Sequence, residues 1–382
     1  MSSYDVLIIG AGIVGCACAL ECVREGLRVG VLERGNIGGG TTAAGMGHVV
    51  VMDDSAAQLA LTAYSRTLWN QLAPELPPQV EYEPRGTIWV AANEDELGEV
   101  AGKQKACGSM NIASEVLDAR QLAQAEPCLR PGLAGGLLVP DDSVIYPPAA
   151  AAYFLEQAVA LGAVALRGYE AVKIEREAVR TQNGELFHAG KILLASGADT
   201  RLLPWLPIQK RKGHLLITDR YPGMVNHQLV ELGYIASAHK VTADSVAFNL
   251  QPRQTGQILI GSSRQYGSEH LGVDAGILKR MLDRAIEYMP SLRQVSGIRV
   301  WTGFRAASED KLPLIGPSGE PSLYLAMGFE GLGITNALGA ARLAVDALLG
   351  RPSAIDHSPY LPERFAKARE AGNQDAQVGT QE

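Results

Sequence analysis

The sequence lacks the features that mark several large classes of protein. No apolar run approaches the ~20 residues that a membrane-spanning helix needs, and no block of like charge interrupts the chain. Lys and Arg total 34 against 41 Asp and Glu, a formal charge of −7 over 382 residues, which disfavours nucleic-acid binding. Only five residues precede the first apolar segment, which leaves no room for a signal peptide and predicts a soluble, cytoplasmic protein.

Metal-binding patterns are also missing from the sequence. The five cysteines form no Cys-x-x-Cys pair, and three of them fall in one predicted helix, where small apolar side chains suit packing against a sheet (Cys16, Cys18 and Cys22). Four histidines are scattered without ligand spacing (His214, His227, His239 and His270). We therefore expect no metal site in this chain, and any iron–sulfur centre would belong to another polypeptide.

A glycine fingerprint near the N-terminus carries the first positive signal. Residues 6–9 read as a buried strand that runs into Gly10-Ala11-Gly12-Ile13-Val14-Gly15, followed by a helix-like run to Glu25, a second strand, and Glu33-Arg34. This order predicts a βαβ unit that binds a dinucleotide, with the pyrophosphate at the helix N-terminus and Glu33 on the ribose hydroxyls. The alternative is a Gly-rich turn with only a structural role. The motif alone does not distinguish an NAD-binding protein from an FAD-binding protein.

Later elements return to the same domain after insertions. The domain continues with a predicted helix over 147–162, a strand over 164–174, a hairpin at Asn183-Gly184 and a buried strand over 191–194. It continues again with a strand over 323–326 and a helix that ends at 349. The stretches between them predict an α+β lobe, with strands at 81–90, 214–218, 245–251 and 257–262 and helices at 94–106, 118–126 and 274–288. An NAD dehydrogenase would normally keep its nucleotide domain in one block, so this threading favours a flavin-binding fold.

Together these motifs resemble the FAD-dependent amine and amino-acid oxidoreductases that include D-amino-acid oxidase, glycine oxidase and sarcosine oxidase. The resemblance implies an α/β fold, with a Rossmann-like FAD-binding domain and an inserted substrate domain built on an antiparallel sheet. The expected limits are 1–80, 141–205 and 306–352 for the FAD-binding domain, 81–140 and 206–305 for the substrate and interface domain, and 353–382 for a C-terminal tail that frays from about residue 369.

Several further segments match that family. Residues 38–48 resemble its Ser/Thr- and Ala-rich segment, in which Thr41 and Thr42 can donate hydroxyl hydrogen bonds to phosphate; a flexible connector is the alternative. Val172 and the stretch from Ala195 through Ser196 to Gly197 match backbone contacts to FAD. No cysteine falls between 305 and 316, where sarcosine oxidases attach FAD covalently, so we expect non-covalent FAD.

Arg305 matches the family arginine that grips the substrate carboxylate, because a planar guanidinium binds a carboxylate in bidentate fashion at any working pH. The alternative is a surface pair with Glu309 or Asp310. Ala306 stands where the family has proline. His48 is the leading residue to position or deprotonate the amine, and Met46 lies where glycine oxidase places a methionine over the flavin, although a core methionine reads equally well. The family's active-site tyrosine has no clean counterpart: Phe248 and Asn249 lie closest, and Tyr234 is a substitute from a neighbouring loop.

The late glycine-rich loop, 328–335, resembles the family segment whose backbone amides face the flavin pyrimidine edge. Phe329 replaces the usual histidine, and Glu330 lies near a second arginine of glycine oxidase, which argues against glycine as substrate. The full set of expected FAD contacts is Gly10, Gly12, Ile13, Val14, Gly15, Glu33, Arg34, Thr41, Thr42, Ala43, Gly45, Met46, Gly47, Val172, Ala195, Ser196, Gly197, Gly303, Arg305, Gly328, Glu330, Gly331, Leu332, Gly333, Ile334 and Thr335.

Within the family, residues 38–54 and 328–335 look most like bacterial D-hydroxyproline dehydrogenases and the catalytic subunits of opine dehydrogenases. This implies hydride transfer from a secondary-amine or D-amino acid to flavin N5, with cis-4-hydroxy-D-proline as the leading substrate. The rivals are a glycine, sarcosine or opine oxidoreductase and a non-catalytic flavin relay subunit. The resemblance also allows a separate electron acceptor, ferredoxin-like and second-flavin subunits or a homo-oligomer, and FMN at a subunit interface near the basic segment 210–214. A solvated basic turn is the preferred reading of that segment.

Overall fold

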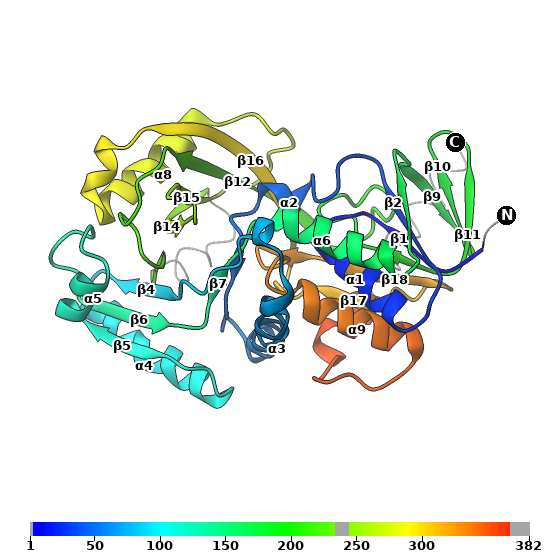
Figure 1. Ribbon diagram of the computed structural model, residues 1–382, viewed down its shortest axis with the longest axis horizontal. Coiled ribbons are helices and arrows are strands. Elements are labelled where there is room, and N and C mark those ends of the chain that lie inside the picture. The colour runs from blue at the N-terminus through cyan, green and yellow to red at the C-terminus, as the bar shows by residue number, and fades with distance from the viewer. Residues whose placement is uncertain (1–2, 234–243, 367–382) are drawn as a thin grey trace. The chain divides into compact units, whose positions relative to one another are not determined.

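The computed structural model describes residues 3–233 and 244–366 of the chain (Figure 1). Contacts between Cα atoms divide the described residues into two units. The first unit draws on Met1–Gly45, Pro147–Lys210 and Arg305–Glu382, and the second on Met46–Tyr146 and Arg211–Phe304. The domain limits given above stay a prediction. The chain passes between the units four times: after Gly45, after Tyr146, within β12 (Ile208–Thr218) and within β16 (Gly297–Ser308).

A mainly parallel sheet forms the centre of the first unit, in the order β17-β18-β11-β1-β2-β8, with β10 and β9 attached beside β11. Strands β1, β2, β8, β11 and β18 pair in parallel, and β17 closes one edge in the antiparallel sense. The bounds of its elements are β1 Tyr4–Ile9, α1 Ile13–Arg24, β2 Val29–Glu33, α2 Thr41–Ala44, α6 Pro147–Ala160, β8 Val164–Arg167, β9 Ala171–Glu175, β10 Ala178–Thr181, β11 Leu186–Leu194, β17 Leu314–Pro317, β18 Leu323–Met327, β19 Phe329–Glu330 and α9 Ala337–Leu349.

Small side chains let α1 pack closely within this unit. Eleven of its twelve residues are buried, among them Cys16, Cys18 and Cys22, and the helix contacts both α6 and α9, as Figure 1 shows. Burial raises the pKa of the Cys18 thiol well above its usual range. These cysteines therefore behave as small core residues in the structure.

The second unit is built on a mixed, mostly antiparallel sheet in the order β19-β16-β12-β15-β14-β13-β4-β6-β5, and β3 and β7 form a separate pair. Its remaining elements have the following bounds: β3 His48–Val49, α3 Ala56–Leu72, β4 Thr87–Ala91, α4 Glu94–Ser109, β5 Glu115–Asp118, α5 Ala119–Ala125, β6 Gly135–Val139, β7 Ser143–Val144, β13 Gln228–Glu231, β14 Ser245–Pro252, β15 Ile258–Arg264 and α8 Ala275–Tyr288.

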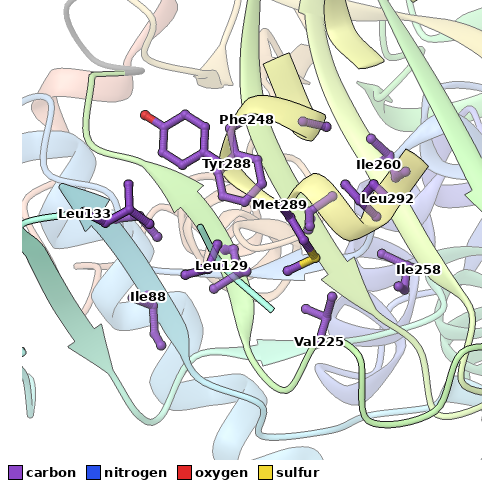
Figure 2. Packing of buried hydrophobic residues seen from close by; sticks show 14 of the residues in the cluster. Ile88, Leu129, Leu133, Val225, Phe248, Ile258, Ile260, Tyr288, Met289 and Leu292 are labelled. Atoms are coloured by element: carbon purple, nitrogen blue, oxygen red, sulfur yellow. The ribbon is translucent and has the colours of Figure 1, made fainter. Parts of the chain in front are cut away.

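One face of this sheet packs against α8 (Figure 2). Phe248 and Leu250 of β14 meet Met281 and Tyr288 of the helix in a buried cluster, and the rings of Phe248 and Tyr288 stack with centroids 4.3 Å apart. Alternate residues of a strand point to opposite faces of the sheet. The residues between them, such as Asn249, therefore lie on the face away from α8.

Side-chain caps set the starts of three helices close to where the sequence predicts them. Asn93 accepts a hydrogen bond from Glu96 N, Asp118 forms a capping box with Gln121, and Asp274 accepts from Ile277 N. No helix in the described part of the chain combines the length and apolar character that crossing a membrane requires.

The structure corrects several expectations. The strand expected over 81–90 begins only at Thr87, and the one expected over 164–174 is two strands, β8 and β9. The segment 210–214 is not a solvated turn: it lies inside β12, where Arg211, Lys212 and His214 are buried. His214 Nε2 accepts from Asp274 N at 3.0 Å and so helps to hold the start of α8.

Candidate functional site

The glycine turn between β1 and α1 is shaped by close backbone contacts. Gly10 has φ +103°, and a Cβ there would lie 2.6 Å from Ala195 O; a Cβ on Gly15 would lie 2.0 Å from Gly10 O. Only glycine fits both positions. The first N–H groups of α1 have no intrahelical partner, and Gly12 at the N-cap has no side chain that could accept from them; the first of them, Ile13 N, donates to Thr42 Oγ1. The turn therefore presents backbone donors and the positive end of a helix dipole to an anion.

Glu33, at the end of β2, accepts hydrogen bonds from the backbone of this turn and of its own loop. One carboxylate oxygen accepts from Ala11 N at 2.8 Å and the other from Gly35 N at 2.7 Å. Each oxygen keeps a further lone pair that can accept from a ribose hydroxyl. Next to it, Arg34 bonds Glu170 and Asp199 at 3.3 and 2.8 Å. Hydrogen bonding to Arg201 is the main reason that the pKa of Asp199 falls to about 2.

The segment from Thr41 to Gly45 links three parts of the first unit. Thr42 is buried and its Oγ1 accepts from Ile13 N at 3.0 Å, so its hydroxyl proton remains available to a phosphate oxygen. A Cβ on Gly197 would lie 3.3 Å from Thr41 Oγ1, and one on Gly45 would lie 2.7 Å from Ile334 Cδ1. The α1 turn, the end of β11 and the loop before α9 therefore all meet this segment.

Arg305 lies beside the late glycine loop. It occupies β16, whose next residue, Ala306, pairs with Glu330, and a Cβ on Gly331 would lie 3.6 Å from Arg305 Nε. Of the two acidic residues named in the alternative interpretation, Asp310 accepts a hydrogen bond from Arg364 Nε at 2.6 Å. The structure thus brings the predicted carboxylate-binding guanidinium to the predicted flavin-facing loop.

Asn336 is a further polar residue of this unit that was not predicted from the sequence. It stands at the N-cap of α9, is 2% exposed, and its Oδ1 has no hydrogen-bond partner among residues 3–233 and 244–366. An asparagine directly before an Ala-rich helix is a recognisable N-cap signal. The N-terminus of α9 and this buried amide therefore lie together in the first unit.

The remaining predicted residues are placed as follows. Val172 on β9 is about half exposed. Met46, Gly47, His48 and Gly303 belong to the second unit. Met46 packs with Leu215 and Leu259, Gly47 O accepts from Ile145 N at 2.8 Å, and His48 pairs with Val144 across β3 and β7. Tyr234 lies outside the described residues.

A metal centre has no counterpart in this geometry. Within residues 3–233 and 244–366, no three His, Cys, Asp or Glu side chains are grouped as ligands would be.

Comparison with known proteins supplies the family context. Residues 5–347 match the profile of the family described as FAD dependent oxidoreductase (DAO). Glycine oxidase from Geobacillus kaustophilus is 26% identical over 94% of this chain and 96% of its own length. D-amino acid dehydrogenase from Methylobacterium nodulans is 27% identical over 81% of this chain and 74% of its own. L-proline dehydrogenase from P. horikoshii, 20% identical, superposes with a TM-score of 0.86 over 96% of this chain and 98% of its own, and so shares the fold.

Proposed function

The chain belongs to the FAD dependent oxidoreductase (DAO) family, and from this premise we propose that it oxidises the C–N bond of a secondary-amine or D-amino acid, with cis-4-hydroxy-D-proline as the leading substrate. The observation that carries the proposal is the position of Arg305 against Gly331, in the unit that also contains the Gly10–Gly15 turn. The positively charged guanidinium of Arg305 beside the glycine loop suits a substrate that carries a carboxylate. The names of two relatives, glycine oxidase and D-amino acid dehydrogenase, support an amino-acid substrate.

The first unit fits non-covalent FAD. The close approach at Gly10 and Gly15, the hydroxyl of Thr42 and the carboxylate of Glu33 suit the ADP half, and the buried amide of Asn336 suits a polar ring edge. The other predicted contacts of this unit, from Ala195 to Gly197 and from Gly328 to Thr335, line the same strand ends and loop. When bound, FAD supplies the acceptor for a hydride from the substrate Cα, while the amine loses a proton and the C–N single bond becomes an imine.

The protein's own residues bind and orient the substrate. Arg305 holds the carboxylate through two parallel N–H···O bonds, which fixes the direction of the Cα–H bond. We assign His48 to positioning the amine or accepting its proton, since an imidazole titrates near neutral pH. Met46 contributes an apolar surface that excludes water, and Tyr234 stays a prediction outside the described residues.

A glycine or sarcosine oxidase is the second candidate, favoured by the similarity to glycine oxidase. Two residues argue against it. The resemblance implies that Phe329 replaces the family's usual histidine and that Glu330 lies near the position of a second arginine in glycine oxidase. An opine dehydrogenase subunit and a non-catalytic relay subunit are further rivals. Transfer of electrons to a carrier on a partner subunit, and FMN at that interface, are extensions of the same proposal.

The test is a substrate panel on the purified flavoprotein, with initial rates measured with and without an artificial electron acceptor. We expect cis-4-hydroxy-D-proline and D-proline to exceed glycine, sarcosine and octopine, with the acceptor raising the rate. Turnover of an opine with indifference to both prolines would contradict the substrate assignment. Extraction and chromatography of the bound flavin separates FAD alone from FAD with FMN.

A further inference from the structure

Four charged side chains form an ion network in the first unit. Arg34 Nη1 donates to Asp199 Oδ2 at 2.8 Å and to Glu170 Oε1 at 3.3 Å. Arg201 Nη2 donates to the same two oxygen atoms, at 2.7 and 2.9 Å. Each of the two carboxylates therefore bonds both guanidinium groups. We call these four residues the Arg34 network.

The Arg34 network connects the ends of three strands. Strands of the parallel sheet follow one another in the order β11-β1-β2-β8 (Figure 1). Arg34 comes directly after β2, Glu170 follows β8, and Asp199 follows β11. Because these strands are parallel, the three residues lie at the carboxyl end of the sheet, which is where ligands bind in folds of this type. The bond from Arg34 to Asp199 therefore crosses the carboxyl end of β1.

The glycine turn that follows β1 is contacted from both ends of that bond. Glu33, which precedes Arg34, accepts from Ala11 N at 2.8 Å. On the side of β11, a Cβ on Gly10 would lie 2.6 Å from Ala195 O. The ion pair thus connects the two chain segments that flank the turn at which the ADP half of FAD is expected.

Asp199 is held from several sides. Its Oδ1 accepts from Arg201 N at 3.1 Å and from Arg201 Nε at 2.9 Å, and its backbone oxygen accepts from Ser196 Oγ at 2.6 Å. Since hydrogen bonding to Arg201 lowers the pKa of Asp199 to about 2, the carboxylate is charged at neutral pH. Arg34, by contrast, bonds both carboxylates through Nη1, and 53% of its side chain is exposed. Asp199 can therefore fix Arg34 while the plane of the guanidinium stays accessible to a ligand.

A guanidinium plane in this position suits an aromatic ring. Guanidinium groups are weakly hydrated and stack on ring faces, and adenine presents such a face. A mobile arginine would lose side-chain entropy when it stacks. An arginine that carboxylates already hold has lost part of that entropy beforehand, so it binds the ring more tightly.

We infer that Asp199 positions the Arg34 guanidinium against the adenosine half of FAD, and so raises the affinity for FAD but not that for FMN, which has no adenosine. Glu170 and Arg201 complete the ion pairs that hold the two residues in place. The inference rests on the binding of FAD by the first unit and is independent of the substrate in the proposed function.

The test is flavin binding by the full-length protein, freed of its flavin and titrated with FAD or FMN. Asp199→Asn keeps the size of the side chain but removes the charge that holds Arg34. We expect the Kd for FAD to rise by about threefold to tenfold, and the Kd for FMN to change by less than about twofold. In an Arg34→Met background the same substitution should change the Kd for FAD by less than about twofold, because no guanidinium remains to be positioned.

Asp5→Asn is the matched control. Asp5 also accepts from a backbone N–H and a guanidinium, those of Arg28, at 2.8 and 2.7 Å, but it lies near the start of β1, at the other end of the strand from the glycine turn. Its substitution should change the Kd for FAD by less than about twofold.

Three results would overturn the inference. Asp199→Asn could keep the wild-type Kd for FAD, weaken FAD and FMN alike, or weaken FAD as strongly in the Arg34→Met background as in the wild type. Each of these results leaves the proposed oxidation of an amino acid in place. A full-length protein that binds neither flavin would instead refute the FAD site, and the proposed function with it.

Discussion

Replacing Gly15 with alanine tests the tight contact between α1 and the β1 turn. In an ordinary helix this change stabilises by about 1 kcal/mol, because alanine has the higher helix propensity. Here the new Cβ would lie 2.0 Å from Gly10 O, where ordinary contact begins at 3.4 Å, so the backbones must separate by about 1.4 Å. Gly10 is fixed in the sheet by its N–H bond to Leu32 O at 2.8 Å. Overpacking of this kind costs about 1–3 kcal/mol or more, which outweighs the propensity gain.

The expected result for Gly15→Ala is a lower thermal midpoint and a marked loss of FAD, measured as flavin released from a known amount of protein. Gly102→Ala is the control: Gly102 lies within α4, and a Cβ there would meet nothing within 4 Å. That variant should keep its FAD and gain about 0.5–1 kcal/mol. If Gly15→Ala kept full flavin and gained stability like the control, the close approach would not position the cofactor.

Three further predictions follow from the geometry. Arg305→Met should lower kcat/KM for amino acids, expressed per bound flavin, by about a hundredfold, because two charge-assisted bonds are lost; an equal rate for the variant would remove Arg305 from substrate binding. Among the five thiols, Cys128, which is partly exposed, should react first with a thiol reagent in the folded protein, since the three in α1 and Cys107 are buried; rapid reaction of all five would contradict the packing. Desolvation raises the pKa of buried Asp142 from 3.8 to about 6 despite Arg66 at 3.3 Å. The folded state therefore favours its protonated form, and its stabilising contribution is lost as pH rises from about 4 through 6. Relative to Asp142→Asn, wild-type stability should fall over that range by on the order of 3 kcal/mol in denaturant titrations, and parallel pH profiles would contradict this.

Local chemistry explains what the sequence predicted well. A positive φ at Gly10 and a missing Cβ at Gly15 are requirements of a single turn, so they are visible in a short motif. The caps Asp118 and Asp274 likewise act within one helical turn. The family resemblance extended these local signals to a fold that the comparisons confirm.

Pairing between distant strands explains what the sequence could not predict. The charges of residues 210–214 indicate a solvated turn, yet β12 lies between β16 and β15 and buries Lys212 completely. Helix α3 was missed because its sequence mixes polar and apolar residues, and its buried side, with Leu59 and Trp69, is defined by the unit around it. The direction of Asn249, on the sheet face away from α8, depends on strand register, which one residue of slip would reverse.

Anaerobic addition of cis-4-hydroxy-D-proline to the purified holoenzyme shows whether the protein oxidises this amino acid. We expect the visible absorption band of oxidised flavin to be lost, because the substrate delivers its hydride to FAD, and we expect an added electron acceptor to restore the band. A flavin that stays oxidised with this and every other amino acid, yet is reduced by dithionite, would contradict the claim and indicate a relay subunit without a substrate of its own.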